Sequence, residues 1–378
     1  MQHYVLGDVI TEISERENNP SNSEYERFVG LEHYVSGEVE IENYGSTANL
    51  NSAMKVFNSG DILVARRNVY LKRASVVYFD GLTSGDSIVL RPKNETIGRI
   101  LPFILNTDDF WDYADQYSDG TMSKRLSPKV LKQYEFDLPD DNLEQLADIL
   151  WAMVDVKKSY QRLLKQTDEL VKSQFIEMFG ELGSDYKGWG LTTLGQCCEL
   201  NPKRPRDIDD ELMVSFVPMP AVSEDGKMDC SNIRPYKEVR KGFTYFAEDD
   251  VLFAKITPCM ENGKGAVARG LEGGIGSGST EFHVLRPIAG KSNPYWLYII
   301  TMFDSFRIGA RKVMTGTGGQ LRVPIGYLND YPISLPPIEL QNRFEEFIHQ
   351  SDKSKFELKQ AIEGVDILIK SMIQQELN

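Results

Sequence analysis

Lysine and arginine side chains gather in short clusters, and their chemistry suits binding to phosphates and to base edges. Three clusters stand out: Arg66, Arg67, Lys72 and Arg73; Lys203, Arg204 and Arg206; and Arg234, Lys237, Arg240 and Lys241. The glycine-rich segment Thr315–Arg322 adds Gln320 and Arg322, whose side chains have suitable hydrogen-bond donors. A solvated surface, or a plain surface hairpin at Thr315–Arg322, is the alternative interpretation.

Catalytic constellations are absent from the sequence. Lys291-Ser292 lacks the first glycine of a phosphate-binding loop, because Leu285 stands at its position. Asn293-Pro294-Tyr295-Trp296 resembles the Asn-Pro-Pro-Tyr motif of adenine methyltransferases, but the second proline is missing and no glycine motif for a cofactor accompanies it. The cap of a helix beginning near Tyr295 is the better explanation. We therefore predict no catalytic residue on this chain.

The sequence gives little support for a metal site or a phosphate-binding site. The four histidines show no metal-ligand spacing, so we predict no metal and no cofactor on this chain. Asp61 and Asp250 each precede a strand pattern, and a turn-forming role explains them as well as an acid–base role does. Gly270–Gly278 has enough glycine to cradle a phosphate, and loop flexibility explains that segment at least as well.

The sequence repeats itself once at long range, with a nearly constant spacing between the matched segments. The matches are Leu6-Gly7 with Leu194-Gly195, Gly60–Arg66 with Asp249–Lys255, Val89–Pro92 with Val284–Pro287, and Leu138-Pro139 with Leu335-Pro336. We also match two expected amphipathic helices, Phe103–Tyr117 and Tyr295–Phe306. Two copies of one unit predict pseudo-twofold symmetry, which suits a ligand with two half-sites.

Composition limits the class of protein. The 378 residues predict more than one domain, and the four cysteines, without a CxxC pair, favour a reducing compartment. We find no signal-peptide pattern and no membrane span, so we predict a cytoplasmic protein. The net charge of −14 opposes long-range attraction to nucleic acid, although local basic patches can still bind it.

Four segments organise the chain into an α+β architecture. Residues 1–137 and 181–335 are predicted to be β-rich, whereas 138–180 and 336–378 have apolar residues at helical spacing. Because an isolated amphipathic helix needs a partner, the two long helices are predicted to pair antiparallel as a coiled coil. The predicted seam or partner-contacting residues are Leu150, Tyr160, Leu164, Phe347, Leu358 and Val365.

This order of segments resembles the specificity subunit of type I restriction–modification systems. The similar strings are Leu194-Gly195, Asp250–Pro258, Glu261–Lys264, Gly278–Pro287 and Leu335–Gln341. The first copy departs from the pattern in two places. Leu138-Pro139-Asp140-Asp141 lacks a second proline, and Arg66-Arg67-Asn68 replaces the Ile-Thr-Pro string.

The resemblance implies a non-catalytic subunit with two target-recognition domains, 1–137 and 181–335. Each would read one half of a split, asymmetric site in double-stranded DNA, while helices 138–180 and 336–378 set the spacing. The implied partners are two methyltransferase subunits, which bind S-adenosylmethionine and methylate adenine, and restriction motor subunits. Its rivals are a stand-alone methyltransferase or nuclease, and a coiled-coil scaffold presenting two β-rich modules to proteins.

Candidate DNA contacts follow from residue type and loop placement within this framework. In the first copy they are Arg66, Arg67, Lys72, Arg73, Lys124 and Arg125. In the second copy they are Lys203, Arg204, Lys255, Lys264, Thr280, Gln320 and Arg322.

Overall fold

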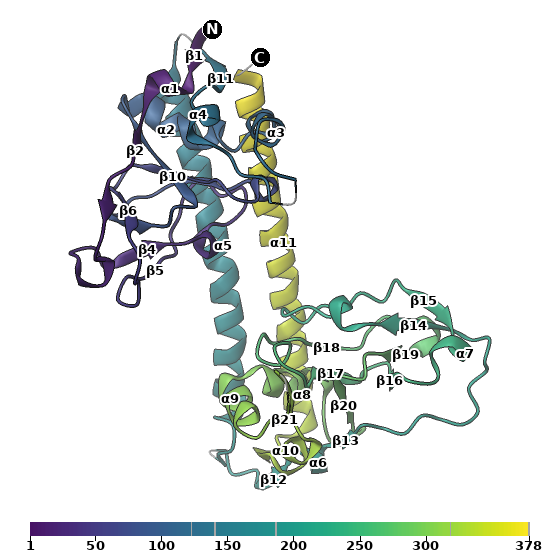
Figure 1. Cartoon of the computed structure of the whole chain (residues 1–378). Helices are drawn as coiled ribbons and strands as arrows, with labels where there is room; N and C mark the ends of the chain where they lie inside the picture. Colours follow the sequence, from purple (N-terminus) through teal and green to yellow (C-terminus); the bar gives the residue numbers. More distant parts are fainter. Residues whose placement is uncertain (122, 140, 186, 318, 377–378) are drawn as a thin grey trace. The chain divides into compact units, whose positions relative to one another are not determined.

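The computed structural model describes residues 1–121, 123–139, 141–185, 187–317 and 319–376 (Figure 1). They form two compact units, one of Met1–Gln161 with Lys359–Asn378 and one of Arg162–Leu358. Two long helices, α5 (Leu143–Phe179) and α11 (Ile338–Glu376), each contribute one part to each unit. Both helices lie within the segments predicted to be helical, and Asp140, expected near the start of the first, lies outside the described residues.

The described residues of the first unit form three sheets. The strands, in spatial order, are β1 (Gln2–Val5) with β11 (Glu135–Leu138); β2 (Ile10–Ile13), β10 (Ser87–Pro92), β7 (Ile62–Ala65) and β8 (Ala74–Val76); and β3 (Arg16–Glu17), β6 (Met54–Phe57), β9 (Gly81–Thr83), β4 (Arg27–Val29) and β5 (Gly45–Ser46). The shorter α-helices are α1 (Leu6–Val9), α2 (Glu95–Ile104), α3 (Asp108–Gln116) and α4 (Pro128–Leu131).

In the second unit, the part of the chain that the structure describes forms four sheets. The strands, in spatial order, are β12 (Leu191–Thr193) with β23 (Pro332–Ser334); β13 (Cys198–Leu200), β20 (Phe282–Pro287), β17 (Val251–Ala254) and β18 (Gly265–Val267); β15 (Ile233–Pro235), β14 (Met213–Val217), β19 (Ile275–Gly278) and β16 (Thr244–Ala247); and β21 (Thr315–Thr317) with β22 (Gln320–Arg322). The shorter α-helices are α6 (Leu194–Cys197), α7 (Tyr236–Val239), α8 (Pro294–Met302), α9 (Asp304–Lys312) and α10 (Ile325–Asp330).

The strand order of the first unit recurs in the second. The sheet β2-β10-β7-β8 corresponds to β13-β20-β17-β18, and all neighbouring strands in both are antiparallel. One parallel pair occurs in each further large sheet, β4 with β9 and β14 with β19. The repeated strings occupy matching places, because β7 and β17, like β10 and β20, are central strands of corresponding sheets. The sequence repeat is therefore a repeat of topology.

The two shorter amphipathic segments are each broken, so the prediction of single helices at Phe103–Tyr117 and Tyr295–Phe306 was wrong. Thr107 starts α3 as its cap, with its hydroxyl accepting a hydrogen bond from the Phe110 amide at 3.2 Å. In the second unit, Phe303 adopts an extended conformation between α8 and α9. The correct correspondence by chain order is therefore α2 with α8 and α3 with α9.

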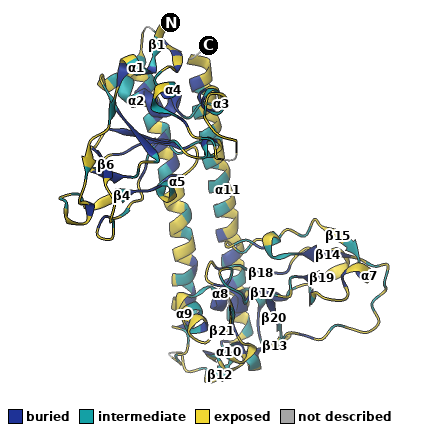
Figure 2. Cartoon of the chain, in the orientation of Figure 1, coloured by how far each residue is buried: buried dark blue, intermediate teal, exposed yellow. Residues whose placement is uncertain are grey.

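Each unit builds its core where a sheet and short helices pack on the long helices (Figure 2). In the first unit, Leu150 and Val154 of α5 join the same buried cluster as Ile373 of α11. In the second, Phe175 of α5 contacts Phe344 of α11, with ring centroids 5.5 Å apart. The early part of α5 thus packs with the end of α11 in one unit, and the late part of α5 packs with the start of α11 in the other.

The predicted seam residues are unequally buried. Leu150 is fully buried, whereas the remaining five are half-buried: Tyr160, Leu164, Phe347, Leu358 and Val365. Lys157 is a buried cation in the first unit, and its Nζ lies 2.8 Å from Glu38 Oε1 and 2.7 Å from Asp366 Oδ1. This arrangement joins α5 to α11 and to the loop before β5. No helix in the described part of the chain is long and apolar enough to span a membrane.

Candidate nucleic-acid interface

The repeated aspartates join a turn to a neighbouring strand in each unit. Asp61 and Asp250 are buried, and each accepts a turn hydrogen bond, from the Asn58 amide at 2.8 Å and the Ala247 amide at 2.7 Å. Each also accepts two hydrogen bonds from an arginine on the central strand beside it, Arg91 for Asp61 and Arg286 for Asp250. The distances are 2.7 and 2.8 Å for Arg91 and 2.8 and 2.6 Å for Arg286.

These ion pairs, each with a buried carboxylate, join the start of β7 to β10 and the start of β17 to β20. Hydrogen bonding to the carboxylate raises the pKa of Arg91 and of Arg286, so both guanidinium groups stay charged. The turn role given to the two aspartates is present in both units, and the arginine pairing adds a reason why the strings around them repeat. They hold the central strands whose ends carry the basic loops.

In the second unit, basic residues converge where β17 ends. The Lys255 amide donates to the Glu281 carbonyl at 2.9 Å, and the Lys255 carbonyl accepts from the Val323 amide at 2.9 Å. The Arg322 guanidinium donates to both Glu281 carboxylate oxygens, from Nε at 2.9 Å and from Nη2 at 2.8 Å. Because this bond favours the charged carboxylate, the pKa of Glu281 lies below its usual range.

The hairpin formed by β21 and β22 is fastened to the same place by Thr257. The Thr257 hydroxyl donates to the Gly319 carbonyl at 2.7 Å and accepts from the Leu321 amide at 3.1 Å. Gln320 is exposed on this hairpin, and Thr280 is exposed beside Glu281. Lys264 lies across from the end of β17, because its carbonyl accepts from the Ala254 amide at 3.1 Å.

Five of the seven candidates in the second unit are therefore brought together: Lys255, Lys264, Thr280, Gln320 and Arg322. The other two lie on a different part of the unit. Lys203 is exposed, and the Arg204 guanidinium lies 5.7 Å from the ring centroid of Tyr236 in α7.

In the first unit, three candidates converge around Asp86. The Arg66 amide donates to the Asp86 carbonyl at 2.9 Å, and the Arg66 carbonyl accepts from the Leu126 amide at 2.8 Å. The Arg125 Nη2 donates to Asp86 Oδ1 at 2.6 Å, while Arg67 Nη1 lies 3.6 Å from Asp86 Oδ2. Arg66, Arg67 and Arg125 thus form a basic cluster at the end of β7.

The other three candidates of the first unit are engaged by protein groups. Arg73 is buried and donates to the Leu31 carbonyl at 3.1 Å and the Arg67 carbonyl at 3.0 Å, so its side chain supports the fold. Lys72 pairs with Asp108 at 2.5 Å. Lys124 pairs with Asp115 at 2.5 Å.

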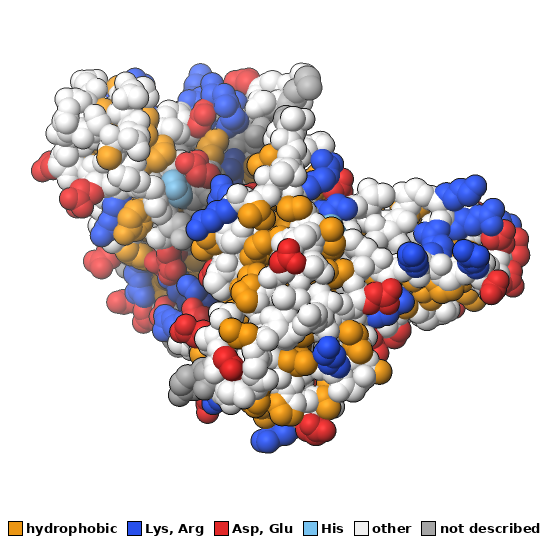
Figure 3. Space-filling model, turned by 90° about the horizontal axis from the view of Figure 1, so that it is seen from below, with side chains coloured by type: hydrophobic (Ala, Val, Ile, Leu, Met, Phe, Trp, Pro, Cys, Tyr) orange, Lys and Arg blue, Asp and Glu red, His pale blue; other side chains and the backbone are white. Residues whose placement is uncertain are grey.

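A further basic surface, which includes the candidates Lys203 and Arg204, covers the end of the second unit that carries β14, β15 and α7 (Figure 3). It comprises Lys203, Arg204, Arg206, Arg234, Lys237, Arg240 and Lys241. Two of these cations are neutralised locally, Lys237 by Glu211 at 2.7 Å and Arg240 by Asp210 at 2.7 Å. The clustering of basic residues in the sequence was the signal for this surface.

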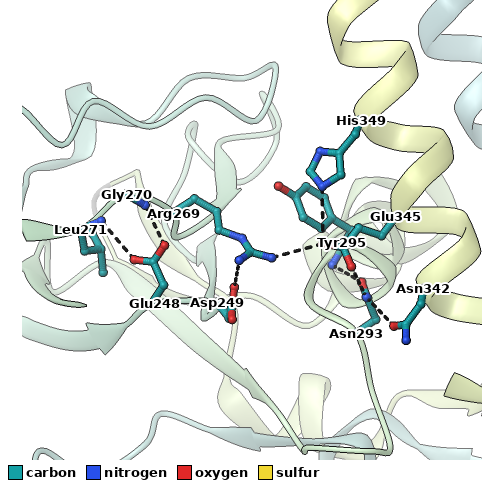
Figure 4. A network of polar contacts seen from close by, with 10 residues as sticks. All are labelled: Glu248, Asp249, Arg269, Gly270, Leu271, Asn293, Tyr295, Asn342, Glu345 and His349. Carbon is teal, nitrogen blue, oxygen red and sulfur yellow. Dashed lines mark hydrogen bonds and ion pairs between the residues drawn. The ribbon is translucent and has the colours of Figure 1, made fainter. Parts of the chain in front are cut away.

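In the second unit, a polar network joins the turn before β17 and the loop after β18 to the start of α11 (Figure 4). Arg269 lies at its centre, 2.6 Å from Asp249 and 3.2 Å from Glu345 on α11. Glu345 also accepts from the Asn293 side chain at 2.6 Å, and Asn293 caps α8. His349 packs its ring edge-on against Tyr295, with centroids 4.8 Å apart. The network thus links the loop after β18 and the cap of α8 to α11.

Among the described residues, no group of three or more histidine, cysteine, aspartate or glutamate side chains could hold a metal ion. In each unit, loop cations are held at the end of a central strand. Such loops suit contacts with the phosphates and base edges of nucleic acid.

Comparison with known proteins shows what this chain is similar to. Residues 186–364 match the family model of the type I restriction modification DNA specificity domain. The resemblance drawn from the sequence is thereby confirmed. The Escherichia coli relatives, specificity subunits of the type I restriction enzymes EcoEI and EcoAI, are 42% identical over 159 residues and 40% identical over 195 residues.

These alignments cover 42% and 48% of this chain, but they span only 26% and 33% of the length of those two relatives. Two solved structures share the fold over the whole chain. A chain from a type I restriction–modification system, studied for its complex assembly and conformational transition, has a TM-score of 0.55 at 18% identity and is covered over 97% of its length. The type I restriction–modification S subunit from M. genitalium has a TM-score of 0.50 at 10% identity and is covered over 96%.

Proposed function

We propose that this chain is the DNA specificity subunit of a type I restriction–modification complex. It recognises a split, asymmetric site in double-stranded DNA and directs adenine methylation, or restriction, by partner subunits. One observation carries the proposal: two units of the same strand order each present cations at the end of the corresponding central strand, β7 or β17. The family match of residues 186–364 supports it independently.

The division of labour follows the four segments of the sequence. Residues 1–137 and 181–335 are the two target-recognition domains, and residues 138–180 and 336–378 are helices that pair antiparallel as a coiled coil. The packing of α5 with α11 within each unit supports this pairing. The candidate contacts best supported by geometry are Arg66, Arg67, Arg125, Lys255, Lys264, Thr280, Gln320 and Arg322.

The long helices are the proposed docking site for two methyltransferase subunits, which supply S-adenosylmethionine, with motor–nuclease subunits joining the complex. Exposed apolar side chains on α5 support this role, because water-facing leucine and isoleucine gain from being covered. Ile149 and Val156 are 38% and 43% exposed in the first unit. In the second unit, Leu163 and Leu170 are 47% and 52% exposed.

A methylome tests the proposal. The chain is co-expressed with its cognate methyltransferase in a methylation-free host, and modified adenines are mapped by single-molecule sequencing. We expect one motif with two short defined halves and a fixed gap. Methylation of a single undivided motif would mean that one unit alone reads DNA. No methylation by a folded, associated pair would overturn the proposal and favour a protein scaffold with two β-rich modules.

A further inference from the structure

We propose that Arg125 and Arg322 are equivalent guanine-reading arginines, one in each unit, and that Asp86 and Glu281 are the residues that position them. The proposal rests on the proposed function and deepens it. It assigns to each half of the DNA site one G·C pair, contacted in the major groove by a guanidinium group that a carboxylate holds in place.

The two clusters have the same connectivity although their sequences differ. In each, the acidic residue accepts from the amide of the cation at the strand end, Arg66 for Asp86 and Lys255 for Glu281. The carbonyl of that cation accepts from the residue after the arginine, Leu126 or Val323. The residue that follows the strand-end cation also forms an isolated β-bridge with the loop arginine: Arg67 pairs with Arg125, and Ile256 pairs with Arg322. Arg125 and Arg322 are therefore structurally equivalent.

Stability gives little reason for this ion pair to occur in both units. The Arg125 and Arg322 side chains are 44% and 40% exposed. Exposed ion pairs contribute about 0–1 kcal/mol to folding. The buried carboxylates of Asp61 and Asp250, each paired with an arginine, already join the central strands of the same sheets. A repeated exposed pair at the tip of a basic loop is better explained by what it presents to a ligand.

The guanidinium group of Arg322 has one edge held and another open. Nε and Nη2 donate to the two Glu281 oxygens, and Nη1 makes one longer bond of 3.3 Å to the Gln320 carbonyl. Nη1 and Nη2 each carry a second hydrogen, directed away from the carboxylate. Two parallel donors of this kind match guanine O6 and N7, the commonest specific contact of arginine with DNA. In the first unit, Asp86 holds Nη2 of Arg125.

The net charge of the Arg322–Glu281 pair favours a base over a phosphate as its ligand. Phosphate contacts gain from net positive charge, because each neutralised phosphate releases counterions. Glu281 cancels the charge of Arg322 while leaving directed N–H donors, so the pair retains hydrogen-bonding geometry and loses most phosphate attraction. This combination suits an uncharged base edge.

The test uses the full chain with its methyltransferase and compares wild type with Arg322→Lys and Arg125→Lys. Lysine keeps the charge but lacks the planar fork. We expect Arg322→Lys to relax one G·C position in one half of the methylation motif, with about a tenfold loss of preference there. We expect Arg125→Lys to do the same in the other half. The matched control is Arg99→Lys, at the exposed Arg99–Asp148 pair, which leaves the motif unchanged.

A second pair of variants removes the positioning group. Glu281→Gln and Asp86→Asn are expected to relax the same positions as the corresponding arginine variants. Because a negative charge is lost, Glu281→Gln should also make the salt dependence of DNA binding steeper, by a log–log slope of about 1. A merely structural glutamate would not produce that change in slope together with a change at one motif position.

The contrary outcomes are distinct. Evenly weaker methylation at an unchanged motif in both lysine variants would assign the arginines to phosphates and overturn the proposal. Relaxation of the same half by both variants would refute their equivalence, and unfolding of the lysine variants would assign the pairs to stability. A wild-type complex without a split motif would overturn the proposed function itself.

Discussion

At the scale of single residues, two kinds of ion pair occur in both units, for different physical reasons. The Asp61–Arg91 and Asp250–Arg286 pairs repeat because both sheets need their central strands joined at a buried turn. The Arg125–Asp86 and Arg322–Glu281 pairs repeat at the surface, on loops of different sequence. Burial of the carboxylate distinguishes the two: Asp61 and Asp250 are 1% and 0% exposed, whereas Asp86 and Glu281 are 24% and 23% exposed. A lone buried charge is strongly unfavourable, whereas a partly exposed one remains solvated.

Arg286→Gln should therefore lower the free energy of unfolding of the second unit by about 3 kcal/mol, because it leaves the buried Asp250 carboxylate without its cation. Urea unfolding followed by circular dichroism measures the loss. Arg99→Gln, at an exposed pair with Asp148, is the control and should change the transition little. Equal losses in the two variants would contradict the distinction between buried and exposed pairs.

The four cysteines should divide into two reactivity classes. Burial raises the pKa of Cys197 to about 11 and of Cys198 to about 12, so below these values their thiols stay protonated and unreactive. Cys230 and Cys259 are half-buried. At pH 8, alkylation followed by mass spectrometry should label Cys230 and Cys259 in the native protein. Cys197 and Cys198 should react only after unfolding, and their early labelling would contradict their burial.

At the scale of elements, equivalent helices of the two units are attached differently. Asn94 caps α2 from an exposed position, with its side chain accepting from the Ile97 amide at 3.0 Å. Asn293 caps α8 from a buried position and also donates to Glu345 on α11. The second unit therefore ties its short helix to the long helix through a polar network that starts at the cap.

Asn293→Ala should consequently cost more than Asn94→Ala. Loss of a cap alone costs about 1 kcal/mol, which is the expected effect of Asn94→Ala. Asn293→Ala should roughly double that loss, because Glu345 also loses a buried hydrogen-bond donor. Hydrogen exchange at the first-turn amides of α2 and α8 gives the local free energy of opening in each variant. Similar protection losses in the two helices would show that the contact with α11 adds nothing.

At the scale of the whole molecule, charge limits how this chain can bind DNA alone. Its net charge is −14, and many surface cations are paired with carboxylates, including Lys72, Lys124, Lys237 and Arg240. Long-range attraction to a duplex should therefore be weak, and partner subunits would supply much of the phosphate-binding surface in the proposed complex.

The salt dependence of DNA affinity should show whether the phosphate-binding surface lies on this chain or on its partner. The isolated chain is expected to bind weakly, with a shallow slope of log affinity against log salt, because few phosphates are neutralised. Addition of the methyltransferase should steepen the slope by several units. Fluorescence anisotropy of a labelled duplex containing the motif measures both. A steep slope already present in the isolated chain would show that its own basic surfaces dominate phosphate binding.

The sequence by itself determined the repeat, the two long helices and the loops that carry the cations. These features have local signals, namely apolar periodicity, glycine-rich turns and matched strings such as Val89–Pro92 and Val284–Pro287. The helix breaks at Thr107 and Phe303 were missed, because helical periodicity continues across a short interruption.

Only the tertiary structure decided which cations remain available to a ligand. Arg73 and Arg125 were both predicted as DNA contacts from residue type and loop placement. In the structure, Arg73 is buried and donates to backbone carbonyls, whereas Arg125 is exposed beside Asp86. The deciding contacts join residues far apart in the chain, such as Arg322 with Glu281. Residue type and spacing indicate local structural propensity. The burial of each cation and the identity of its charged partner depend on how strands and loops from distant parts of the chain pack together.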